Sequence, residues 1–397
     1  MKIGLLREGK IPPDRRVPFS PVQCKIILDT YSDISISIQS SEIRCFSDLE
    51  YQKNGVSIQE NLSDCDIIMG VKEVPINMLI DNKIFLFFSH TIKKQPYNQK
   101  LLKTIITKNI QLIDYETLVD EHNKRIIGFG RYAGIVGAYN SFLAYGKKSK
   151  TYDLKSPQFL IGKKELEREL LKVQLPKDFK IILTGGGRVA SGAVEILKIL
   201  NIQEIDKEDF LNTNINSPSY VQLMPIDYHE KKDGSVSSKN DFYDLPNKYR
   251  SSLLKFCCRG DMLITGHYYH PNSPILLTKE DIQSRFFNLK VVGDISCDIA
   301  GPIASTIRPS TIEDPLYGYN RFLGQEDNYM KDEVLVVMAV DNLPCSLPKD
   351  ASSDFGNVFI NQILKDLIEM GPVSMKGSIT LNGCLTDRFK YLSDYVS

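Results

Sequence analysis

The sequence lacks an excess of charge of either sign, because 49 Lys and Arg residues balance 49 Asp and Glu residues. A polyanionic partner such as nucleic acid is therefore not expected. Long apolar runs are missing too. The most apolar run near the middle of the first half covers residues 84–88, far fewer than the roughly 18 residues that cross a bilayer. We therefore expect no membrane association.

Cysteine pairs of the CxxC type are absent, and no histidine lies at zinc-finger spacing from a cysteine. The cysteines are scattered along the chain, at positions 24, 45, 65, 257, 258, 297, 345 and 384. Thiols in this arrangement are typical of a reducing compartment, not of a disulfide framework or a zinc site. The opening residues MKIGLLREGK have no apolar core after their charges, so we expect no signal peptide and a cytoplasmic location.

What is present is the composition of a globular protein. The chain has 397 residues, of which 42% are hydrophobic and 25% charged, enough for two or three domains with sizeable cores. Short apolar runs alternate with amphipathic stretches such as 21–31 and 98–108, which predicts βαβ units and parallel sheets. The predicted strands are Lys2–Leu6, Ile34–Ile38, Asp66–Val71, Lys83–Phe88, Asn109–Asp114, Phe179–Thr184, Tyr220–Met224, Met262–Thr265, Leu289–Val292 and Val334–Val340. The stretch 131–145 is predicted to form a helix that connects a first block, with the first five of these strands, to a second block, with the other five.

A glycine turn follows the predicted strand 179–184 and opens a helix. Its residues, Gly185 to Ala190, fit the pattern GxGxx(G/A) and include Gly187, Arg188 and Val189. Glycine allows a tight turn and lets a pyrophosphate approach backbone N–H groups at a helix N-terminus. The alternative is a plain strand–helix turn. Asp206, 19 residues after Gly187, is the candidate acid for the adenosine ribose, and Glu204 lies close by. Either acid would favour NAD over NADP. The alternative is that both are solvated surface acids.

Polar side chains follow four of the first five predicted strands. The first strand is followed by Arg7, Glu8 and Arg16, the third by Lys72 and Glu73, the fourth by His90 and the fifth by Glu116. Parallel strands present their carboxyl ends at one edge of a sheet, where ligands bind. A lysine, a histidine and carboxylates gathered there would tune one another's pKa values for proton transfer. For any one of them alone, an ordinary loop residue is the alternative.

Two acids, Asp294 and Asp298, follow the strand 289–292 in the second block. They could orient a nicotinamide ribose or a substrate amine, or they could cap a turn. His267 and His270 have a spacing that invites a metal, but Pro271 follows them and no third ligand is evident. We therefore interpret them as loop histidines.

These motifs together resemble the lysine-forming saccharopine dehydrogenases and lysine–oxoglutarate reductases, in a superfamily with alanine dehydrogenase and the N-terminal domain of transhydrogenase. The resemblance covers nearly the whole chain. The motifs that carry it are LREGKIPPDRRVPFSP, MGVKEVP, FFSHTIKKQ, GRYAGIVGAYN, LTGGGRVASGA, GDISCDIAGP and VDNLPCSLPKDASSDFG.

The resemblance implies an α/β fold of two Rossmann-like parallel-sheet domains that flank a cleft. The first domain would be discontinuous, with residues 1–138 and 352–397 forming the substrate domain and residues 139–351 the NAD-binding domain. Lys72 and His90 match the family's acid–base pair, and Glu73 and Glu116 the acids that modulate it. Arg16 and Arg131 match residues that engage substrate carboxylates, and Asp298 the acid beside the nicotinamide.

The implied activity is NAD-dependent oxidation of a secondary amine, saccharopine, to lysine and 2-oxoglutarate, or the reverse. The expected ligands are amino-acid and 2-oxo-acid substrates together with NAD, and no metal is expected. Alternatives are an alanine dehydrogenase or other opine-type enzyme, and a catalytically silent NAD-binding sensor or scaffold. The sequence does not set the number of subunits. Two segments match no motif, residues 147–177 and residues 227–247. The second is polar and is interpreted as a surface excursion or lid.

Overall fold

The chain divides into two compact units in the computed structural model, which describes residues 1–237, 239–270 and 272–397. Unit 1 comprises Met1–Phe129 and Pro348–Ser397, and unit 2 comprises Gly130–Leu347. The division therefore falls at 129/130 and 347/348. The expected boundaries at 138/139 and 351/352 lie inside two helices, Gly130–Ser149 and Pro348–Gln362.

Unit 1 is built on a six-stranded sheet in the order β3-β2-β1-β4-β5-β6, in which every neighbouring pair is parallel. Its strands are β1 (Lys2–Leu5), β2 (Ser35–Ile38), β3 (Ser57–Ile58), β4 (Ile67–Met69), β5 (Ile84–Phe87) and β6 (Gln111–Asp114), with a small pair β17 (Thr380–Leu381) and β18 (Cys384–Leu385). Its helices are α1 (Pro21–Thr30), α2 (Asp48–Lys53), α3 (Gln99–Thr107), α11 (Pro348–Gln362), α12 (Leu364–Glu369), α13 (Pro372–Gly377) and α14 (Ser393–Val396).

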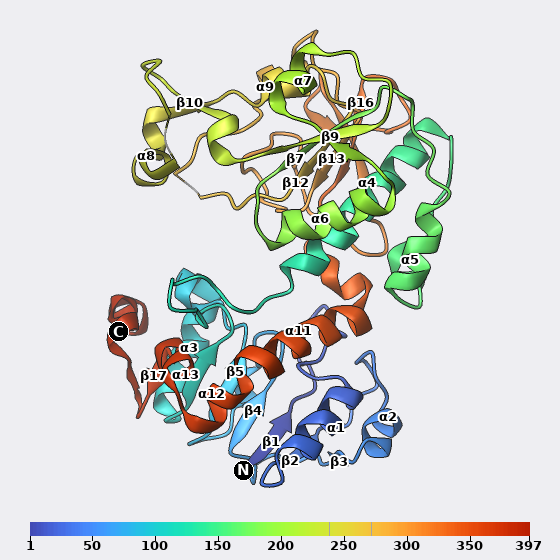
Figure 1. Cartoon of the computed structure of the whole chain (residues 1–397). Helices are drawn as coiled ribbons and strands as arrows, with labels where there is room; N and C mark the ends of the chain where they lie inside the picture. The colour runs from blue at the N-terminus through green and yellow to red at the C-terminus, as the bar shows by residue number, and fades with distance from the viewer. Residues whose placement is uncertain (238, 271) are drawn as a thin grey trace. The chain divides into compact units, whose positions relative to one another are not determined.

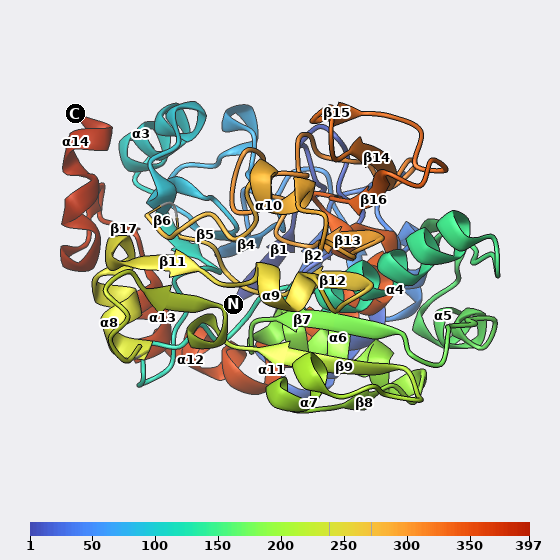
Figure 2. The same ribbon diagram turned by 90° about the horizontal axis from the view of Figure 1, so that it is seen from above.

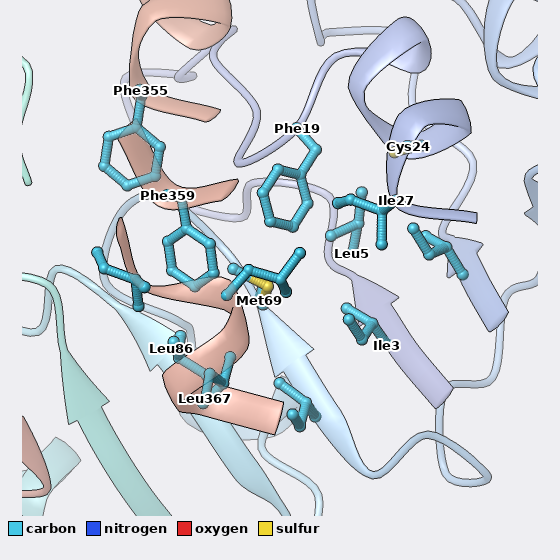
Figure 3. Packing of buried hydrophobic residues seen from close by; sticks show 14 of the residues in the cluster. Ile3, Leu5, Phe19, Cys24, Ile27, Met69, Leu86, Phe355, Phe359 and Leu367 are labelled. Carbon is cyan, nitrogen blue, oxygen red and sulfur yellow. The ribbon is translucent and has the colours of Figure 1, made fainter. Parts of the chain in front are cut away.

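The C-terminal helices complete the core of unit 1. Figure 1 shows α11 and α12 lying against β1, β4 and β5, which come from the other end of the chain. In Figure 3, Phe355 and Phe359 of α11 pack with Phe19 and Met69. The rings of Phe19 and Phe359 meet edge to face, with centroids 5.3 Å apart. Because the N-terminal sheet buries this face against α11 and α12 as well as against α1, unit 1 is discontinuous, as predicted.

Unit 2 has an eight-stranded sheet in the order β15-β14-β16-β13-β12-β7-β9-β8. The strands are β7 (Lys180–Thr184), β8 (Gln203–Glu204), β9 (Ser219–Leu223), β12 (Met262–Thr265), β13 (Val291–Asp294), β14 (Leu316–Asn320), β15 (Gln325–Glu326) and β16 (Val334–Met338), with a separate antiparallel pair β10 (His229–Lys231) and β11 (Tyr249–Ser251). The helices are α4 (Gly130–Ser149), α5 (Lys163–Leu170), α6 (Arg188–Ile199), α7 (Lys207–Asn212), α8 (Lys239–Asp244), α9 (Leu254–Cys257) and α10 (Lys279–Gln283).

The central strands of unit 2 are parallel from β8 to β16, while β14 and β15 are antiparallel at one edge. Figure 2 shows β16, β13, β12, β7, β9 and β8 in this order. Strands β7, β12 and β16 are buried throughout, which explains their largely apolar sequences. The prediction of an α/β protein with two Rossmann-like sheets is confirmed, and the antiparallel edge is the part that the sequence did not indicate.

Helices α4 and α6 cross at unusually short distance, because glycines face each other's backbone. A Cβ atom on Gly134 of α4 would collide with the Val189 carbonyl oxygen of α6, and one on Gly192 of α6 would collide with the Arg131 carbonyl oxygen of α4. Figure 1 shows the two helices together on one side of the sheet. The crossing holds the N-terminal turn of α6 at the carboxyl end of β7.

Candidate active site

The sheet topology of unit 1 brings the predicted strand-end residues together. Strands β1, β4, β5 and β6 are adjacent and parallel, so the loops that follow them leave from one edge. These loops carry Arg16, Lys72, Glu73, His90 and Glu116. The geometric prediction from strand ends is therefore confirmed, and it supplies the candidate site of this unit.

His90 lies between two carboxylates. Its Nδ1 is 3.0 Å from Glu116 Oε2, and its Nε2 is 4.0 Å from Glu73 Oε1. Because an ionised carboxylate only accepts, Nδ1 donates to Glu116, and this tautomer leaves the lone pair on Nε2. The backbone of His90 is left-handed, with φ of 53°, and its ring stacks on that of Phe88, with centroids 6.3 Å apart. His90 Nε2 is therefore the nitrogen available for proton transfer.

Glu116 is kept ionised by its surroundings. Burial acts to raise its pKa, but the hydrogen bond from His90 and the charges of Lys93 and Arg125 outweigh burial and lower the pKa to about 2. Lys93 Nζ lies 3.5 Å from Glu116 Oε1, and Arg125 Nη1 lies 3.4 Å from the same oxygen. Two cations therefore fix the carboxylate that orients the imidazole.

The Glu116 shift predicts how stability depends on pH. Its contribution is present above about pH 4.5 and is lost as the pH falls toward 2, because the folded-state pKa lies below the ordinary 4.5. The shift corresponds to about 3 kcal/mol. In urea titrations, the unmodified protein should lose more unfolding free energy between about pH 5 and about pH 3 than Glu116→Gln does. The same substitution at exposed Glu121 is the control, and equal losses in all three proteins would contradict the prediction.

Lys72 is the ammonium of the site, and its pKa is lowered. Burial is the main cause, and the positive charge of Arg16 adds to it. Glu8 holds the backbone that carries Lys72: its two carboxylate oxygens accept from the N–H groups of Val71 and Lys72 at 2.6 and 2.9 Å. Burial and the charge of Asp14 raise the pKa of Glu8 to about 7. Lys72 is therefore positioned to give up its proton more readily than an exposed lysine.

Glu73 links the lysine side of the site to the histidine. Its Oε2 accepts from Lys10 Nζ at 2.7 Å. Its Oε1 is buried without a hydrogen-bond partner among the described residues, on the side that faces His90. A buried carboxylate oxygen in this position is suited to accept a hydrogen bond from a bound amine.

Arg16 is buried and holds an internal carboxylate. Its Nε and Nη2 donate to the two oxygens of Asp14 at 3.0 and 2.6 Å, and its guanidinium carbon lies 4.1 Å from the Phe129 ring centroid. Asp14 is thus a part of the site that sequence reasoning missed. The contact of Arg16 with a substrate carboxylate stays a prediction.

The glycine turn of unit 2 has the geometry that dinucleotide binding requires. Gly185 has φ of +91°, and a Cβ there would lie 2.5 Å from the Gly266 carbonyl oxygen, so only glycine fits. Gly187 is the N-cap of α6 and provides no side-chain cap, while a Cβ on it would meet nothing within 4 Å. Ala190 is buried against Gly266. Open space before an uncapped helix N-terminus suits a pyrophosphate.

Asp206 requires a correction. The strand next to β7 is β9, and β8, which precedes Asp206, lies beyond it at the sheet edge. Asp206 is instead the N-cap of α7, accepting from the Asp209 N–H at 2.8 Å. The strand that lies beside β7 is β9, and the segment that follows it is Met224–Asp227. The residue count from the glycines led to the end of β8, because β8 and α7 come before β9 in the sequence.

Asp294 is also occupied within the fold. It is fully buried at the end of β13 and accepts from the hydroxyls of Thr265, Ser296 and Thr306 at 2.7, 2.8 and 2.6 Å. These contacts favour the turn-capping alternative for Asp294, and the role of orienting a ribose stays a prediction. Asp298 lies farther along the same loop and is only partly buried, and its place beside the nicotinamide stays a prediction.

Arg131 belongs to unit 2 and forms an ion pair within that unit. It lies in the first turn of α4, and its Nε and Nη2 donate to the two oxygens of Glu195 on α6 at 2.5 and 2.8 Å. Lys163 donates to the same carboxylate at 2.8 Å. The structure therefore gives Arg131 an internal carboxylate in place of the substrate carboxylate that the resemblance implied. Arg188 and Val189 form the first turn of α6, as the glycine motif predicted.

The two histidines with metal-like spacing do not form a metal site. His267 Nδ1 lies 2.6 Å from Thr184 Oγ1, and His270 Nδ1 accepts from the Asn272 N–H at 3.2 Å. Pro271 lies outside the described residues. Across the described part of the chain, no group of three His, Cys, Asp or Glu side chains could hold a metal ion.

Over the same residues, no helix is both long and apolar enough to cross a membrane.

Several residues of the cluster in unit 1 carried no distinct signal. Glu8 was visible as a strand-end residue, but its role required the loop geometry. The others lie in loops or short turns after the strands, where their spacing has no period: Lys10, Asp14, Lys93 and Arg125. Only the observation that oppositely charged residues gather in the same loops could have pointed to them.

Comparison with known proteins agrees with this architecture. Residues 4–136 match the family described as alanine dehydrogenase/PNT, N-terminal domain. The fold superposes on L-alanine dehydrogenase with a TM-score of 0.67 and 16% identity, covering 100% of both chains. It superposes on a transhydrogenase from Sinorhizobium meliloti with a TM-score of 0.59 and 12% identity, covering 97% of this chain and 98% of the other. These likenesses show the fold.

One group of sequence relatives carries a name that the motifs suggested, saccharopine dehydrogenase, and another group carries a name that they did not suggest. The alpha-aminoadipic semialdehyde synthase of Mus musculus is 28% identical over 98% of this chain and 47% of its own length, and that of Arabidopsis thaliana is 28% identical over 98% and 41%. Saccharopine dehydrogenase [NAD(+), L-lysine-forming] of Emericella nidulans is 24% identical over 92% of both chains. The chain spans about half the length of the synthases it matches. The predicted resemblance is confirmed.

Proposed function

We propose that the protein is an NAD-dependent oxidoreductase that acts on the C–N bond of a secondary amine, interconverting saccharopine with lysine and 2-oxoglutarate. The observation that carries the proposal is the placement of His90 between Glu73 and Glu116, with Lys72 on the same sheet edge. Oxidation of a secondary amine followed by hydrolysis needs several proton transfers near neutral pH. Two residues can supply these transfers: His90, and Lys72, whose pKa is lowered by burial.

The residues of this chain divide the work as follows. His90 Nε2 and the Lys72 ammonium move protons to and from the amine nitrogen and, after water adds to the imine, to and from the carbinolamine. Glu116 orients His90, and Glu8 holds the backbone at Lys72. Arg16 binds a substrate carboxylate through its guanidinium, beside Asp14.

Unit 2 fits the dinucleotide. Gly185 and Gly187 with the first turn of α6 would hold its pyrophosphate, since no side chain caps the helix and a Cβ at Gly187 would meet nothing nearby. The bound dinucleotide supplies the acceptor for the hydride that leaves the C–N carbon. The preference for NAD is supported by the name of the Emericella nidulans relative. Asp227, just after β9, carries no argument for it, because its carboxylate is already held by Lys207 and by the Met224 N–H.

The experiment is a panel of reductive assays that follow NADH oxidation by the purified protein. Lysine with 2-oxoglutarate is compared with pyruvate plus ammonia and with ornithine plus 2-oxoglutarate, and each pair is repeated with NADPH. Turnover confined to lysine, 2-oxoglutarate and NADH is the expected result. Turnover only with pyruvate and ammonia would replace the proposal by an alanine dehydrogenase activity. NADH binding without turnover of any pair would leave a silent binding protein.

A further inference from the structure

A fully buried carboxylate at the end of β6 has no role in the function proposed so far. Asp114 is the last residue of β6 and is 0% exposed. Across the sheet it is paired with Phe87, the last residue of β5. The backbone ladder between the two strands therefore ends at this pair. The loops that carry His90 and Glu116 begin directly beyond it.

The side chain of Asp114 continues the connection where the ladder stops. Its Oδ2 accepts hydrogen bonds from the Ser89 N–H at 2.8 Å and from the Ser89 hydroxyl at 2.5 Å. Its Oδ1 accepts from the Glu116 N–H at 2.7 Å. Since Ser89 directly precedes His90, one carboxylate holds both the residue before the imidazole and the residue that binds the imidazole.

Ser89 is held from its other sides as well. Its hydroxyl lies 2.8 Å from the hydroxyl of Thr91, and its carbonyl oxygen accepts from Asn98 Nδ2 at 3.1 Å. Ser89, Thr91 and Asn98 are all buried. His90 is thus flanked on both sides by buried residues of one hydrogen-bond network, and that network ends at Asp114.

A carboxylate is an expensive group to bury at this position. Among the described residues, the hydrogen-bond partners of Asp114 are neutral N–H and O–H groups, and none is a cation. Burial and the charge of Glu116 raise the pKa of Asp114, and the hydrogen bonds from Ser89 and Glu116 act against this rise. Packing alone would be served by an apolar side chain, such as those of Leu112 and Ile113 in the same strand. What a carboxylate adds is two acceptor oxygens that face two different loops.

We infer that Asp114 is a positioning residue for proton transfer, which fixes the loop of His90 to that of Glu116 and so maintains their hydrogen bond. The inference rests on the proposed function, because it takes His90 as a proton carrier. The bond from His90 Nδ1 to Glu116 Oε2 is 3.0 Å long, and a shift of either loop by about 0.5 Å is enough to lose it. Without this bond the hydrogen is free to move to Nε2, and the lone pair that takes up a proton is lost.

The test is Asp114→Asn, which keeps the shape of the side chain but replaces one acceptor oxygen by an amide NH2 group. In either orientation of the amide, the N–H of Ser89 or that of Glu116 faces a nitrogen that cannot accept. We expect kcat with lysine and 2-oxoglutarate to fall about 10- to 100-fold. The affinity for NADH should not change, because the glycine turn belongs to unit 2.

Asp366→Asn is the matched control within unit 1. The carboxylate of Asp366 on α12 also accepts from two backbone N–H groups, those of Val373 and Ser374 on α13, at 3.0 and 2.6 Å. These partners are not residues of the candidate active site. The control therefore loses the same kind of bond and some stability, and it should keep the kcat of the unmodified protein.

The hydrogen on the His90 ring gives a readout that a general loss of stability would not move. The chain has five histidines, so labelling with ¹⁵N-histidine gives few signals, and His90→Gln assigns those of His90. NMR spectra are recorded without substrate. We expect one tautomer, with the hydrogen on Nδ1, in the unmodified protein and in Asp366→Asn, and a mixture of both tautomers in Asp114→Asn.

The outcomes separate the inference from the proposed function. A kcat of Asp114→Asn equal to that of Asp366→Asn would overturn the inference, and so would a lower kcat with the tautomer of His90 unchanged. Absence of turnover in the unmodified protein would overturn the proposed function, while the tautomer would still show whether Asp114 holds His90.

A second variant covers the case in which Asp114→Asn does not fold, which circular dichroism would show. Ser89→Ala removes the hydroxyl that donates to Asp114 and keeps the Ser89 N–H. It should give the same mixture of His90 tautomers and the same loss of kcat to a smaller extent. A single tautomer together with full activity in this variant would overturn the inference.

Discussion

Lys72→Met and His90→Gln are each expected to lower kcat/KM for the reductive reaction of lysine and 2-oxoglutarate by about 10²- to 10⁴-fold. Methionine keeps the length of the lysine side chain but removes its proton, and glutamine removes the imidazole lone pair. Neither change should lower the affinity for NADH, because both residues lie in unit 1 and the glycine turn lies in unit 2. Initial rates and NADH fluorescence titrations measure the two effects separately.

Matched controls lie on the surface of the same unit. Lys100 and His122 are exposed, so Lys100→Met and His122→Gln repeat the chemical changes away from the cluster and should keep full activity. The pH profile adds a second readout: because the pKa of Lys72 is lowered, its titration should appear in the alkaline limb of kcat/KM and disappear in Lys72→Met. Full activity in either site variant would remove that residue from the proposed proton transfer.

Gly187→Asp should abolish dinucleotide binding, weakening it by about 100-fold or more, without loss of folding stability. A Cβ at this position meets nothing within 4 Å, the backbone φ of −89° suits any residue, and aspartate is a preferred N-cap that complements the helix dipole. The new carboxylate would, however, occupy the space expected for the pyrophosphate and repel it. Fluorescence titration with NADH and urea denaturation test the two halves of the prediction.

Gly134→Ala is the informative contrast on the partner helix. Its Cβ would collide with the Val189 carbonyl oxygen, which is backbone and cannot rotate away, so we expect a loss of about 1–3 kcal/mol in the free energy of unfolding. One glycine is thus needed for packing and the other for the ligand. NADH binding by Gly187→Asp at unchanged affinity would contradict the placement of the pyrophosphate.

The strand-end rule predicted much of the site in unit 1 because it depends only on strand order and direction. Lys72, His90 and Glu116 each follow a buried apolar strand, and β4, β5 and β6 lie side by side. The pairing of His90 with Glu116 was not visible, since it depends on the left-handed turn at His90. Lys93 and Arg125, which help to lower the pKa of Glu116, lie in loops without periodicity.

The prediction was less reliable in unit 2, because there the candidate acid was chosen by its distance in sequence from the glycines and not by the order of the strands. Asp206 follows the glycines at the expected distance, but β9 and not β8 lies beside β7. The segment 227–247, interpreted as a surface excursion or lid, contains β10, which pairs with β11 just after the segment. Which strand inserts beside β7 is decided by long-range packing, which the local sequence does not record.

The measurement that tests the central claim most directly is isotope transfer from NADH deuterated at both C4 positions to the product of lysine and 2-oxoglutarate. We expect saccharopine that carries one deuterium on the carbon newly bonded to the lysine nitrogen, detected as a mass increase of about one unit, and no labelled product from Lys72→Met in the same time. Saccharopine without deuterium, or no coupled product while NADH binds, would contradict the assignment of this chain as an oxidoreductase of the C–N bond.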